Sequence, residues 1–264
     1  MISVSIIGFG NVGSQLSRKW NLTDASKAQQ SGTSRVQLTS ILTSKADQIL
    51  AKMPDLPLVS TWDAWTPAAV NILAVADDQI EAAAQHIADD ALVVHTAGSV
   101  AMNVLKRFPR RGVFYPLQTI STEASIDWTQ VPFCIEAAQE ADYPLLEELA
   151  QSLGSTSRRL NSHKRKEIHL AAVMLNNFTH HLLQQVAAYC EDLDLPQHLL
   201  QPLLEETVSK FYKNNLLKTQ TGPARRGDYQ TLKSHLELLK GRPQQGLYHQ
   251  LTNSILHTYG REKL

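Results

Sequence analysis

Short runs of apolar residues alternate with helical stretches through the first 160 residues of the chain. β-Branched and other apolar residues in runs of four to seven are typical of strands, whereas segments such as 77–88 carry the spacing of a helix. The predicted strands are residues 3–7, 36–42, 70–75, 92–95, 112–115 and 131–135, followed by a helix around 141–153 and a last short strand near 156–160. This alternation indicates an α/β fold in which helices cover a parallel sheet.

The pattern changes after residue 161, where apolar residues recur every three or four positions, as on one face of a long helix. These residues are Ile168, Ala171, Ala172, Leu175, Phe178, Leu182, Val186 and Tyr189. Prolines and glycines at 196, 202, 222–223 and 241–243 divide the remainder into shorter helices. We therefore predict two domains, an α/β domain over residues 1–160 and an all-helical domain over residues 161–264.

Composition narrows the class of protein. With 264 residues, 43% hydrophobic residues and a formal net charge of zero, the chain suits two ordinary globular lobes and gives no reason to expect a nucleic-acid partner. No apolar run approaches the length of a membrane span, and the N-terminus lacks the features of a signal peptide. The two cysteines, Cys134 and Cys190, lie in apolar segments and are expected to be buried free thiols. These features predict a cytoplasmic protein without membrane or nucleic-acid partners.

A G-x-G-x-x-G motif follows directly after the first predicted strand and opens a helix. It comprises Gly8, Phe9, Gly10, Asn11, Val12 and Gly13. In a dinucleotide-binding Rossmann domain the first glycine permits the tight turn, the second lets the backbone approach the pyrophosphate, and the third lets helix and strand pack closely. The alternative is that the motif is only a structural strand–helix turn in another kind of α/β protein. The context favours a doubly wound Rossmann sheet that binds a nicotinamide dinucleotide.

The end of the second strand indicates which dinucleotide is bound. NAD enzymes place an acid there for the ribose 2′-hydroxyl, but this strand is followed by Thr43, Ser44 and Lys45, and the first acid, Asp47, is expected in the next helix. Two hydroxyls and a cation suit a 2′-phosphate. We predict NADP as the cofactor, with NAD-linked chemistry as the alternative because surface lysines are common.

Small residues follow two further strands and would let the cofactor lie along the carboxyl edge of the sheet. The predicted cofactor contacts there are Ala74, Val75, Ala76, Thr96 and Gly98. Asp77, which follows Ala76, is expected to cap the next helix.

Four segments, VVHTAGSV, YPLQTI, HLAAVMLNNF and TGPARRGDYQTLKSHLELL, together resemble a family of Rossmann-like proteins with a C-terminal helical domain of unknown function. That family is grouped with pyrroline-5-carboxylate reductase and deazaflavin-dependent NADP oxidoreductases. The resemblance implies an NADP-binding domain followed by a helical domain similar to that of 6-phosphogluconate dehydrogenase, with helices exchanged across a homodimer. The chain departs from the pattern at Tyr115, where histidine is common, and at Arg225, where the residue is usually small.

Candidate chemistry in the first domain centres on His95, which ends a strand at the carboxyl edge. Its imidazole could give a proton to a carbonyl or imine as hydride arrives, or could only orient the following loop. Ser99 could bind substrate or cap a helix. In the YPLQTI segment, Gln118 is a further candidate for substrate binding.

Two candidates lie on the long helix. His169 and Asn176 are seven residues apart, about two turns, and so are predicted to project from one face. β-Hydroxyacid dehydrogenases use a lysine four residues before the equivalent asparagine, and here that position is Ala172. We predict a catalytic role for Asn176 and substrate binding for His169, for which packing is the alternative.

The last candidates are Arg226 and Asp228 in the T-G-P-x-x-R-G-D loop. A guanidinium beside a glycine turn can hold a carboxylate or phosphate, whereas a salt bridge between the two residues, or a helix cap by Asp228, are the structural alternatives. Ten histidines occur without a metal-ligand motif, so no metal is predicted. The basic run 164–166 is expected to be a solvated helix face.

The sequence thus supports two hypotheses. In the first, the chain is an NADP-dependent oxidoreductase whose small carbonyl or imine substrate lies between the domains, with His95, Asn176 and Arg226 as proton donor, orienting group and anion site. In the second, it binds NADP without catalysis and reports the state of the cofactor.

Overall fold

The computed structural model describes residues 1–27, 36–213 and 216–264 of the chain, and these residues form two compact units, Met1–Asn176 and Asn177–Leu264. The first unit extends beyond the predicted domain boundary at residue 160, because the first helix after that boundary is bonded to the sheet through Ser162 and Arg165. The units are described separately below.

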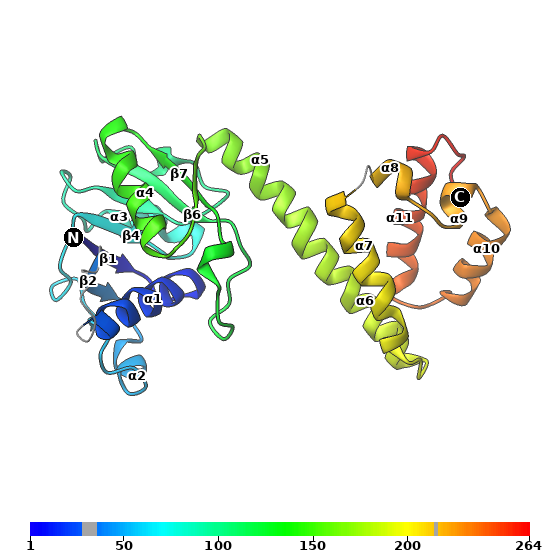
Figure 1. Ribbon diagram of the computed structural model, residues 1–264, viewed down its shortest axis with the longest axis horizontal. Coiled ribbons are helices and arrows are strands. Elements are labelled where there is room, and N and C mark those ends of the chain that lie inside the picture. The colour runs from blue at the N-terminus through cyan, green and yellow to red at the C-terminus, as the bar shows by residue number, and fades with distance from the viewer. Residues whose placement is uncertain (28–35, 214–215) are drawn as a thin grey trace. The chain divides into compact units, whose positions relative to one another are not determined.

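An eight-stranded sheet forms the centre of the first unit, with strand order β3-β2-β1-β4-β5-β6-β7-β8 (Figure 1). Every neighbouring pair is parallel except β6 and β7, which are antiparallel. The strands are β1 Ile2–Ile7, β2 Val36–Leu42, β3 Leu58–Val59, β4 Val70–Leu73, β5 Val93–His95, β6 Arg111–Pro116, β7 Phe133–Ala137 and β8 Ser157–Arg159. The order β3-β2-β1-β4-β5-β6 is that of a Rossmann sheet, which confirms the predicted fold class. The sequence did not predict the two-residue strand β3 or the reversal at β7.

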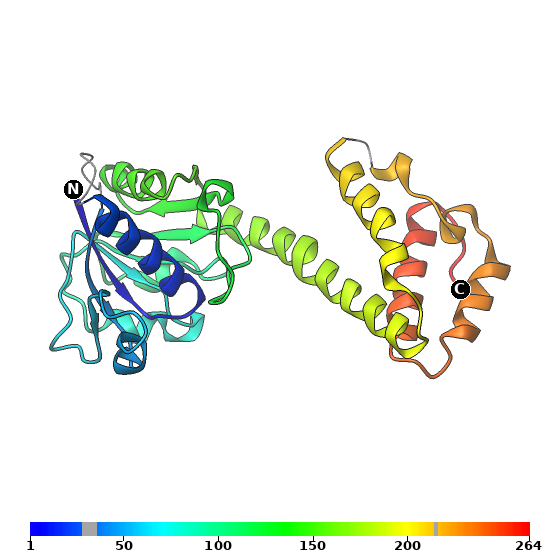
Figure 2. The same cartoon turned by 60° about the horizontal axis from the view of Figure 1, so that its bottom comes forward.

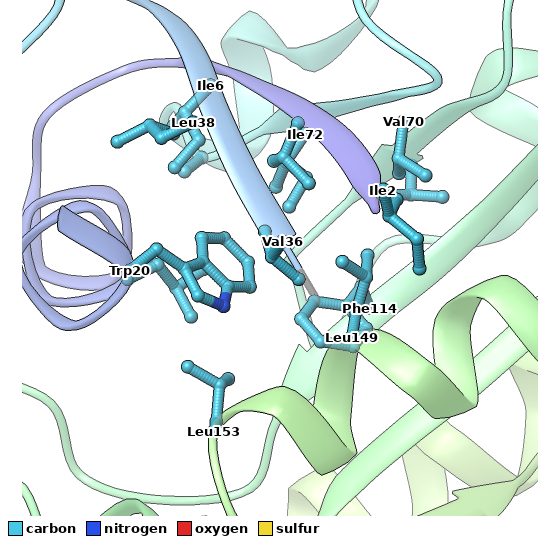
Figure 3. Packing of buried hydrophobic residues seen from close by; sticks show 14 of the residues in the cluster. Ile2, Ile6, Trp20, Val36, Leu38, Val70, Ile72, Phe114, Leu149 and Leu153 are labelled. Atoms are coloured by element: carbon cyan, nitrogen blue, oxygen red, sulfur yellow. The ribbon is translucent and has the colours of Figure 1, made fainter. Parts of the chain in front are cut away.

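Helices cover both faces of this sheet. They are α1 Asn11–Lys27, α2 Ala46–Leu50, α3 Ile80–Ala84 and α4 Tyr143–Ser152, with short 3₁₀ helices η1 Asp77–Gln79, η2 Met102–Leu105, η3 Trp128–Gln130 and η4 Glu140–Asp142. The next helix, α5 Ser162–Ala172, begins at the sheet and leads away from it (Figure 1). Consecutive residues of one strand enter opposite cores: Ile72 packs with Trp20 and Leu149 (Figure 3), whereas Leu73 packs with Ile80 and Phe108. Burial on both faces suits the mainly apolar central strands β4 and β5, whereas β1 and β2 also carry polar residues, among them Ser3, Ser5 and Gln37.

The second unit is helical throughout its described residues, as predicted (Figure 2). Its helices are α6 Thr179–Asp192, η6 Gln197–Leu200, α7 Gln201–Lys213, α8 Leu216–Thr219, α9 Pro223–Arg226, α10 Tyr229–Leu238 and α11 Gln244–Thr258. Boundaries between helices fall at the predicted prolines and glycines: Pro196 precedes η6, Gly222 precedes α9, and Gly241 lies between α10 and α11. No helix in the described part of the chain is long and apolar enough to cross a membrane.

The long helix predicted from residue 168 onward is interrupted by a π-helix, η5 Val173–Phe178, which connects α5 to α6. A π-helix bonds residue i to i+5 and is therefore wider than the α-helix on either side. The interruption changes the angular relation between residues before and after it, which matters for the candidate pair on this helix.

A buried ion pair holds α5 on the sheet. The guanidinium of Arg165 is fully buried and pairs with Glu136 of β7, and it also donates a hydrogen bond to the carbonyl of Val100 in the loop after β5. Ser162 at the start of α5 donates to both carboxylate oxygens of Glu136, from its amide at 2.9 Å and its hydroxyl at 2.8 Å, and the amide of Met102 donates to this hydroxyl at 2.9 Å. The network joins β7, α5 and the β5 loop.

This arrangement corrects the prediction for the basic run 164–166. Lys164 and Lys166 are exposed as expected, but Arg165 between them is buried. The helix begins at Ser162 because the side chain of Asn161 caps it by accepting a hydrogen bond from the amide of Lys164 at 2.9 Å. The register of the helix then turns every fourth side chain inward, toward the sheet.

Replacing Glu136 with alanine should destabilise the first unit by about 3–5 kcal/mol, because it leaves the charge of Arg165 buried without a partner. Urea unfolding followed by tryptophan fluorescence measures this unit alone, since the chain has four tryptophans and all precede residue 129. Glu167→Ala is the matched control: it removes a carboxylate paired with Lys164 on the same helix, but with both side chains exposed, and should leave the unfolding midpoint nearly unchanged. Equal effects of the two substitutions would contradict the structural importance of the buried pair.

Candidate functional site

The glycine turn between β1 and α1 has two glycines that the protein itself requires. Gly8 has φ +104°, and a Cβ there would lie 2.4 Å from the carbonyl oxygen of Ala74. A Cβ on Gly13 would lie 2.2 Å from the carbonyl oxygen of Gly8. Both positions therefore exclude any side chain, the first by backbone conformation and contact, the second by close packing of helix on strand.

Gly10 differs, because a Cβ built there meets nothing within 4 Å. It is exposed and directly precedes the first residue of α1, where backbone N–H groups point outward at the positive end of the helix dipole. The protein's own packing does not require glycine at this position. Space for a molecule outside the protein, at a helix N-terminus suited to an anion, does explain it.

The other predicted residues of the turn have ordinary structural surroundings. Phe9 and Val12 are partly buried and pack against the larger core, whereas Asn11 is exposed and its carbonyl accepts a hydrogen bond from the Ser14 hydroxyl at 3.2 Å. Their backbone, more than their side chains, borders the open space.

A cavity of about 460 Å³ lies beside the glycine turn and brings several predicted cofactor residues together. Gly8, Thr43, Ser44 and Val75 line it, together with residues that carry no sequence motif: Ile7, Leu42, Ser60, Trp62, Gln79, Ala82, Ala83 and His86. The lining contains hydroxyls, an amide and an imidazole but no carboxylate. Such a lining suits a polar or anionic ligand with an apolar part.

Two aromatic rings form one wall of this cavity. Trp62 and His86 are stacked, with ring centroids 4.4 Å apart and an interplanar angle of 15°. They come from different segments, one between β3 and β4 and the other after α3, so neither was predicted. Only the folded chain brings these two flat surfaces together.

Lys45 lies next to this cavity in sequence but does not line it. The residue is exposed, and its amide donates to the Thr43 hydroxyl at 3.4 Å at the start of α2. Asp47 lies in the first turn of α2, as predicted. After β2, Thr43 and Ser44 therefore line the cavity with their hydroxyl-bearing side chains, and Lys45 lies outside the lining. The nearest acid, Asp47, belongs to α2.

The loop after β4 contacts the glycine turn and the loop after β5. The amide of Ala74 donates to the carbonyl of Ile7 at 2.8 Å, and Ala76 precedes η1. Asp77 does not cap that helix, which corrects the prediction; its carboxylate instead accepts a hydrogen bond from the Ser99 hydroxyl at 2.6 Å. This bond also occupies Ser99, which is exposed and whose role in substrate binding stays a prediction.

His95 ends β5 and is fully buried. Its Nδ1 accepts a hydrogen bond from the amide of Ala97 at 3.2 Å. Burial, and secondarily the charge of Arg165, lowers the pKa of His95 to about 3. A neutral imidazole bonded to the following loop fits the orienting role better than the proton-donor role, since it has no acidic proton to give near neutral pH.

The loop after β5 is tightly packed. Thr96 donates from its amide to the carbonyl of Leu73 at 3.2 Å. A Cβ on Gly98 would lie 2.5 Å from Nδ1 of His169 and 2.8 Å from Cζ of Tyr115. Glycine at position 98 therefore makes room for two side chains of the protein, whatever contact it also makes with a cofactor.

Tyr115 and His169 form a pair that the sequence did not predict. The Tyr115 hydroxyl lies 3.0 Å from Nδ1 of His169, and the rings meet edge-on with centroids 5.8 Å apart. Burial, followed by the neighbouring Cys134 thiol, raises the pKa of Tyr115 to about 12 against the opposing charge of Arg165. The sequence singled out Tyr115 only as a departure from the family pattern. Its contact with His169 becomes visible only in the tertiary structure.

Gln118 and Asn176, two further candidates, are both exposed. The side-chain oxygen of Gln118 accepts from the amide of Thr119 at 2.9 Å. Asn176 lies within η5, so the regular α-helical spacing used to align it with His169 does not hold over the whole segment; that the two residues share a face stays a prediction.

Arg226 and Asp228 lie in the second unit. Asp228 caps α10, accepting from the amide of Thr231 at 3.1 Å and its hydroxyl at 2.7 Å, and these bonds lower the pKa of the carboxyl. No salt bridge joins Arg226 to Asp228, both of which belong to the described part of the chain. The capping alternative is therefore confirmed and the salt-bridge alternative is wrong.

Two simpler features complete the description. Cys134 and Cys190 are buried and free, as predicted. Within residues 1–27, 36–213 and 216–264, no three His, Cys, Asp or Glu side chains are grouped so that they could hold a metal ion.

Fold and site together define a Rossmann-type α/β protein with a helical C-terminal part, and comparisons with known proteins give its family. The family described as "Domain of unknown function (DUF2520)" matches residues 131–255. The chain is 30% identical to a solved structure named "putative NADP oxidoreductase BF3122 from Bacteroides fragilis", with a TM-score of 0.81 and coverage of 97% of this chain and 98% of that chain. The chain belongs to this family of Rossmann-like NADP-oxidoreductase-type proteins, as its motifs predicted.

More distant structures share the fold. Protein TM1727 from Thermotoga maritima is 21% identical, with a TM-score of 0.69 and coverage of 97% and 98% of the two chains. A reductive aminase from Aspergillus terreus, solved in complex with NADPH and ethyl-5-oxohexanoate, is 12% identical, with a TM-score of 0.69 and coverage of 98% and 99%. No curated protein matches the chain by sequence.

The glycine turn gives a direct stability test. Gly13→Ala should lower the free energy of unfolding by about 3 kcal/mol, at the upper end for overpacking, because the new methyl group collides with backbone. Gly10→Ala should cost less than about 1 kcal/mol, because the methyl group enters open space. Urea titration by tryptophan fluorescence compares them. If Gly10→Ala proved as destabilising as Gly13→Ala, the space beside Gly10 would not be open in solution.

Proposed function

We propose that the protein is an NADP-dependent oxidoreductase that transfers hydride between NADP(H) and a small carbonyl or imine compound, or the corresponding alcohol or amine. The observation that carries this proposal is the cavity beside the glycine turn, which has hydroxyls at the end of β2 and no carboxylate in its lining. The name of the Bacteroides fragilis relative supports the class of reaction.

The residues present fit the cofactor. The pyrophosphate would lie at the N-terminus of α1, in the open space beside Gly10. Thr43 and Ser44, with Ser60 beside them, would donate to the 2′-phosphate, and Lys45 would supply charge from the rim. The stacked rings of Trp62 and His86 offer a flat wall for the adenine.

The bound cofactor would supply the hydride, and the chain's own residues would position the acceptor and manage the proton. His95 would hold the β5 loop in place as a neutral acceptor from Ala97. Substrate contacts by Ser99, Gln118, His169, Asn176, Arg226 and Asp228, and a substrate site between the two domains, stay predictions. The cytoplasmic location likewise stays a prediction.

Fluorescence and calorimetric titration with NADPH and NADH tests the cofactor. We expect preference for NADPH, reduced about tenfold by Lys45→Ala, roughly the weight of one charge-assisted contact at an exposed site, and inverted by Ser44→Glu, which places the acid that NAD enzymes carry. Gly10→Ala should weaken both dinucleotides without unfolding the protein. Lys52→Ala, another exposed lysine nearby, is the control and should change nothing.

The titration, together with a test for oxidation of NADPH, distinguishes an oxidoreductase from a non-catalytic NADP-binding protein. Failure to bind either dinucleotide would reject the proposal. Binding of NADPH without oxidation in the presence of aldehydes, ketones, 2-oxo acids and cyclic imines would favour a non-catalytic NADP-binding protein.

We further propose that the chain forms a homodimer through its C-terminal helices. Large apolar side chains are exposed along α6, η6 and α7, among them Leu182, Val186, Leu199, Leu203, Val208 and Phe211. A groove of about 640 Å³ in the second unit has an almost wholly apolar lining. Apolar surface of this extent is unusual on a monomer and marks an interface.

A second copy of the chain is the occupant that these properties favour. The six named side chains are uncharged and so do not select a partner of complementary charge, and an isologous interface needs only the same apolar surface on both subunits. Burial of these leucines against their counterparts would be driven by the hydrophobic effect alone.

Sedimentation velocity tests the dimer. Leu203→Glu should shift the protein toward monomer by placing a charge at an apolar interface, whereas Gln201→Glu, which adds the same charge at an exposed polar position of the same helix, should remain dimeric. A wild-type protein that sediments as a monomer at micromolar concentration would refute the proposal.

A further inference from the structure

Tyr115 and His169 are a hydrogen-bonded couple of titratable side chains beside the β5 loop, and the proposed function gives this couple no joint role. Tyr115 comes from the end of β6 and His169 from α5, and Gly98 lacks a side chain where both approach the loop. Each of the three positions is needed for the contact, because any Cβ at residue 98 would displace the other two side chains.

The position of the pair follows from the sheet register. β5 ends at His95, which pairs with Val113 of β6, so Tyr115 extends two residues past the last residue of β5. In this strand order a dinucleotide crosses the carboxyl edge from the β2 side to the β5 side, with its pyrophosphate at the β1 turn. The cavity with Thr43 and Ser44 belongs to the β2 side. Tyr115 therefore lies toward the other half of the dinucleotide, where the nicotinamide is expected.

The Arg165 network fixes the angle from which His169 approaches. Arg165 precedes His169 by four residues, one turn of α5, and so projects from the same side of the helix. With Arg165 bonded to Glu136 and to the carbonyl of Val100, that face of α5 is held against the β5 loop. His169 is half-buried, so one end of its ring meets Tyr115 while the side chain remains in part accessible to solvent.

We propose that the hydroxyl of Tyr115 gives the proton that completes reduction of the substrate, and that His169 passes the replacing proton from solvent to Tyr115. This inference rests on the proposed oxidoreductase function. Hydride from NADPH forms the new C–H bond, the C=O or C=N electron pair moves onto the oxygen or nitrogen, and that atom takes the Tyr115 proton. The phenolate then recovers the proton on Nδ1 of His169 as Nε2 of the same ring takes a proton from solvent, so that the imidazole keeps an N–H throughout; NADP⁺ and the alcohol or amine are the products.

Comparison with His95 supports the assignment. His95 is fully buried, with Nδ1 already engaged by the Ala97 amide and no hydrogen bond of ordinary geometry at Nε2 to any described residue. It stays neutral near neutral pH and is bordered by protein. The Tyr115 hydroxyl keeps its proton over the same range, because its pKa is raised, and an alkoxide forming beside it is a strong enough base to take that proton.

Tyr115→Phe in the full-length protein tests the proposal. For aldehydes and ketones we expect turnover to fall about 10²–10⁴-fold, the range for loss of a general acid, with NADPH affinity unchanged. The preformed cation N-methyl-1-pyrrolinium needs hydride but no proton, so its reduction should fall by no more than about threefold. His169→Gln should give a smaller loss confined to the carbonyl acceptors. Equal loss on both kinds of acceptor, or none on carbonyls, would overturn the assignment.

Tyr248→Phe is the matched control. Tyr248 makes an equivalent contact in the second unit, its hydroxyl lying 2.8 Å from Nδ1 of His235, with edge-on rings 5.8 Å apart. The substitution removes the same type of hydrogen bond, between residues of the second unit only. Carbonyl reduction should be retained in this variant.

A second measurement needs no substrate. The imidazole signal of His169 in the ¹³C-histidine-labelled protein, assigned by its loss in His169→Gln, is followed by NMR with NADP⁺ and with 2′-phospho-ADP-ribose, which lacks only the nicotinamide. We expect both to bind and only NADP⁺ to shift the signal. If neither binds, the proposed function fails first. If both bind and the signal responds identically to each, NADP binding stands and the role of the pair is overturned.

Discussion

The buried pairing of Arg165 with Glu136 decides where α5 lies, and the candidate chemistry depends on that helix. A guanidinium with no exposed surface is tolerated because the Glu136 carboxylate and the Val100 carbonyl accept hydrogen bonds from it, and because Ser162 donates to both oxygens of that carboxylate. The pair crosses from a strand to a helix and to the loop after β5. Its charge also reaches His95, where together with burial it keeps the imidazole neutral.

Three glycines, which lack a side chain, allow the close contacts at the carboxyl edge of the sheet. Gly8 and Gly13 let β1, the β4 loop and α1 meet backbone to backbone, and Gly98 lets Tyr115 and His169 reach the β5 loop. Gly10 makes no such contact. The other three glycines are needed for packing, whereas Gly10 leaves space for a ligand. The ends of β1 and β2 thus border the cavity in which we propose that the dinucleotide binds, while the end of β6 and helix α5 carry the polar pair to which we assign proton transfer.

Much of the fold could be predicted because its signals are local. The G-x-G-x-x-G turn, the apolar strand runs, and the prolines and glycines that end helices act within a few residues, so β1, β2 and the helical C-terminal part were predicted correctly. Thr43 and Ser44 were also identified correctly as neighbours of the glycine turn, since parallel strands in a Rossmann sheet bring their carboxyl ends to one edge. Asp77 was misassigned because capping competes with a partner 22 residues away, Ser99.

What the sequence by itself determined is the class of fold and the helical character of the second half. Only the tertiary structure decided which polar residues are buried and which meet. Arg165 lies in a basic run whose composition suggests solvent, yet helix register turns it inward to Glu136. Trp62 with His86, and Tyr115 with His169, come from separate elements and touch only after the sheet has set its strand order. Contacts of this kind have no local pattern, because they depend on packing between segments far apart in the chain, and on a π-helix that shifts the spacing around Asn176.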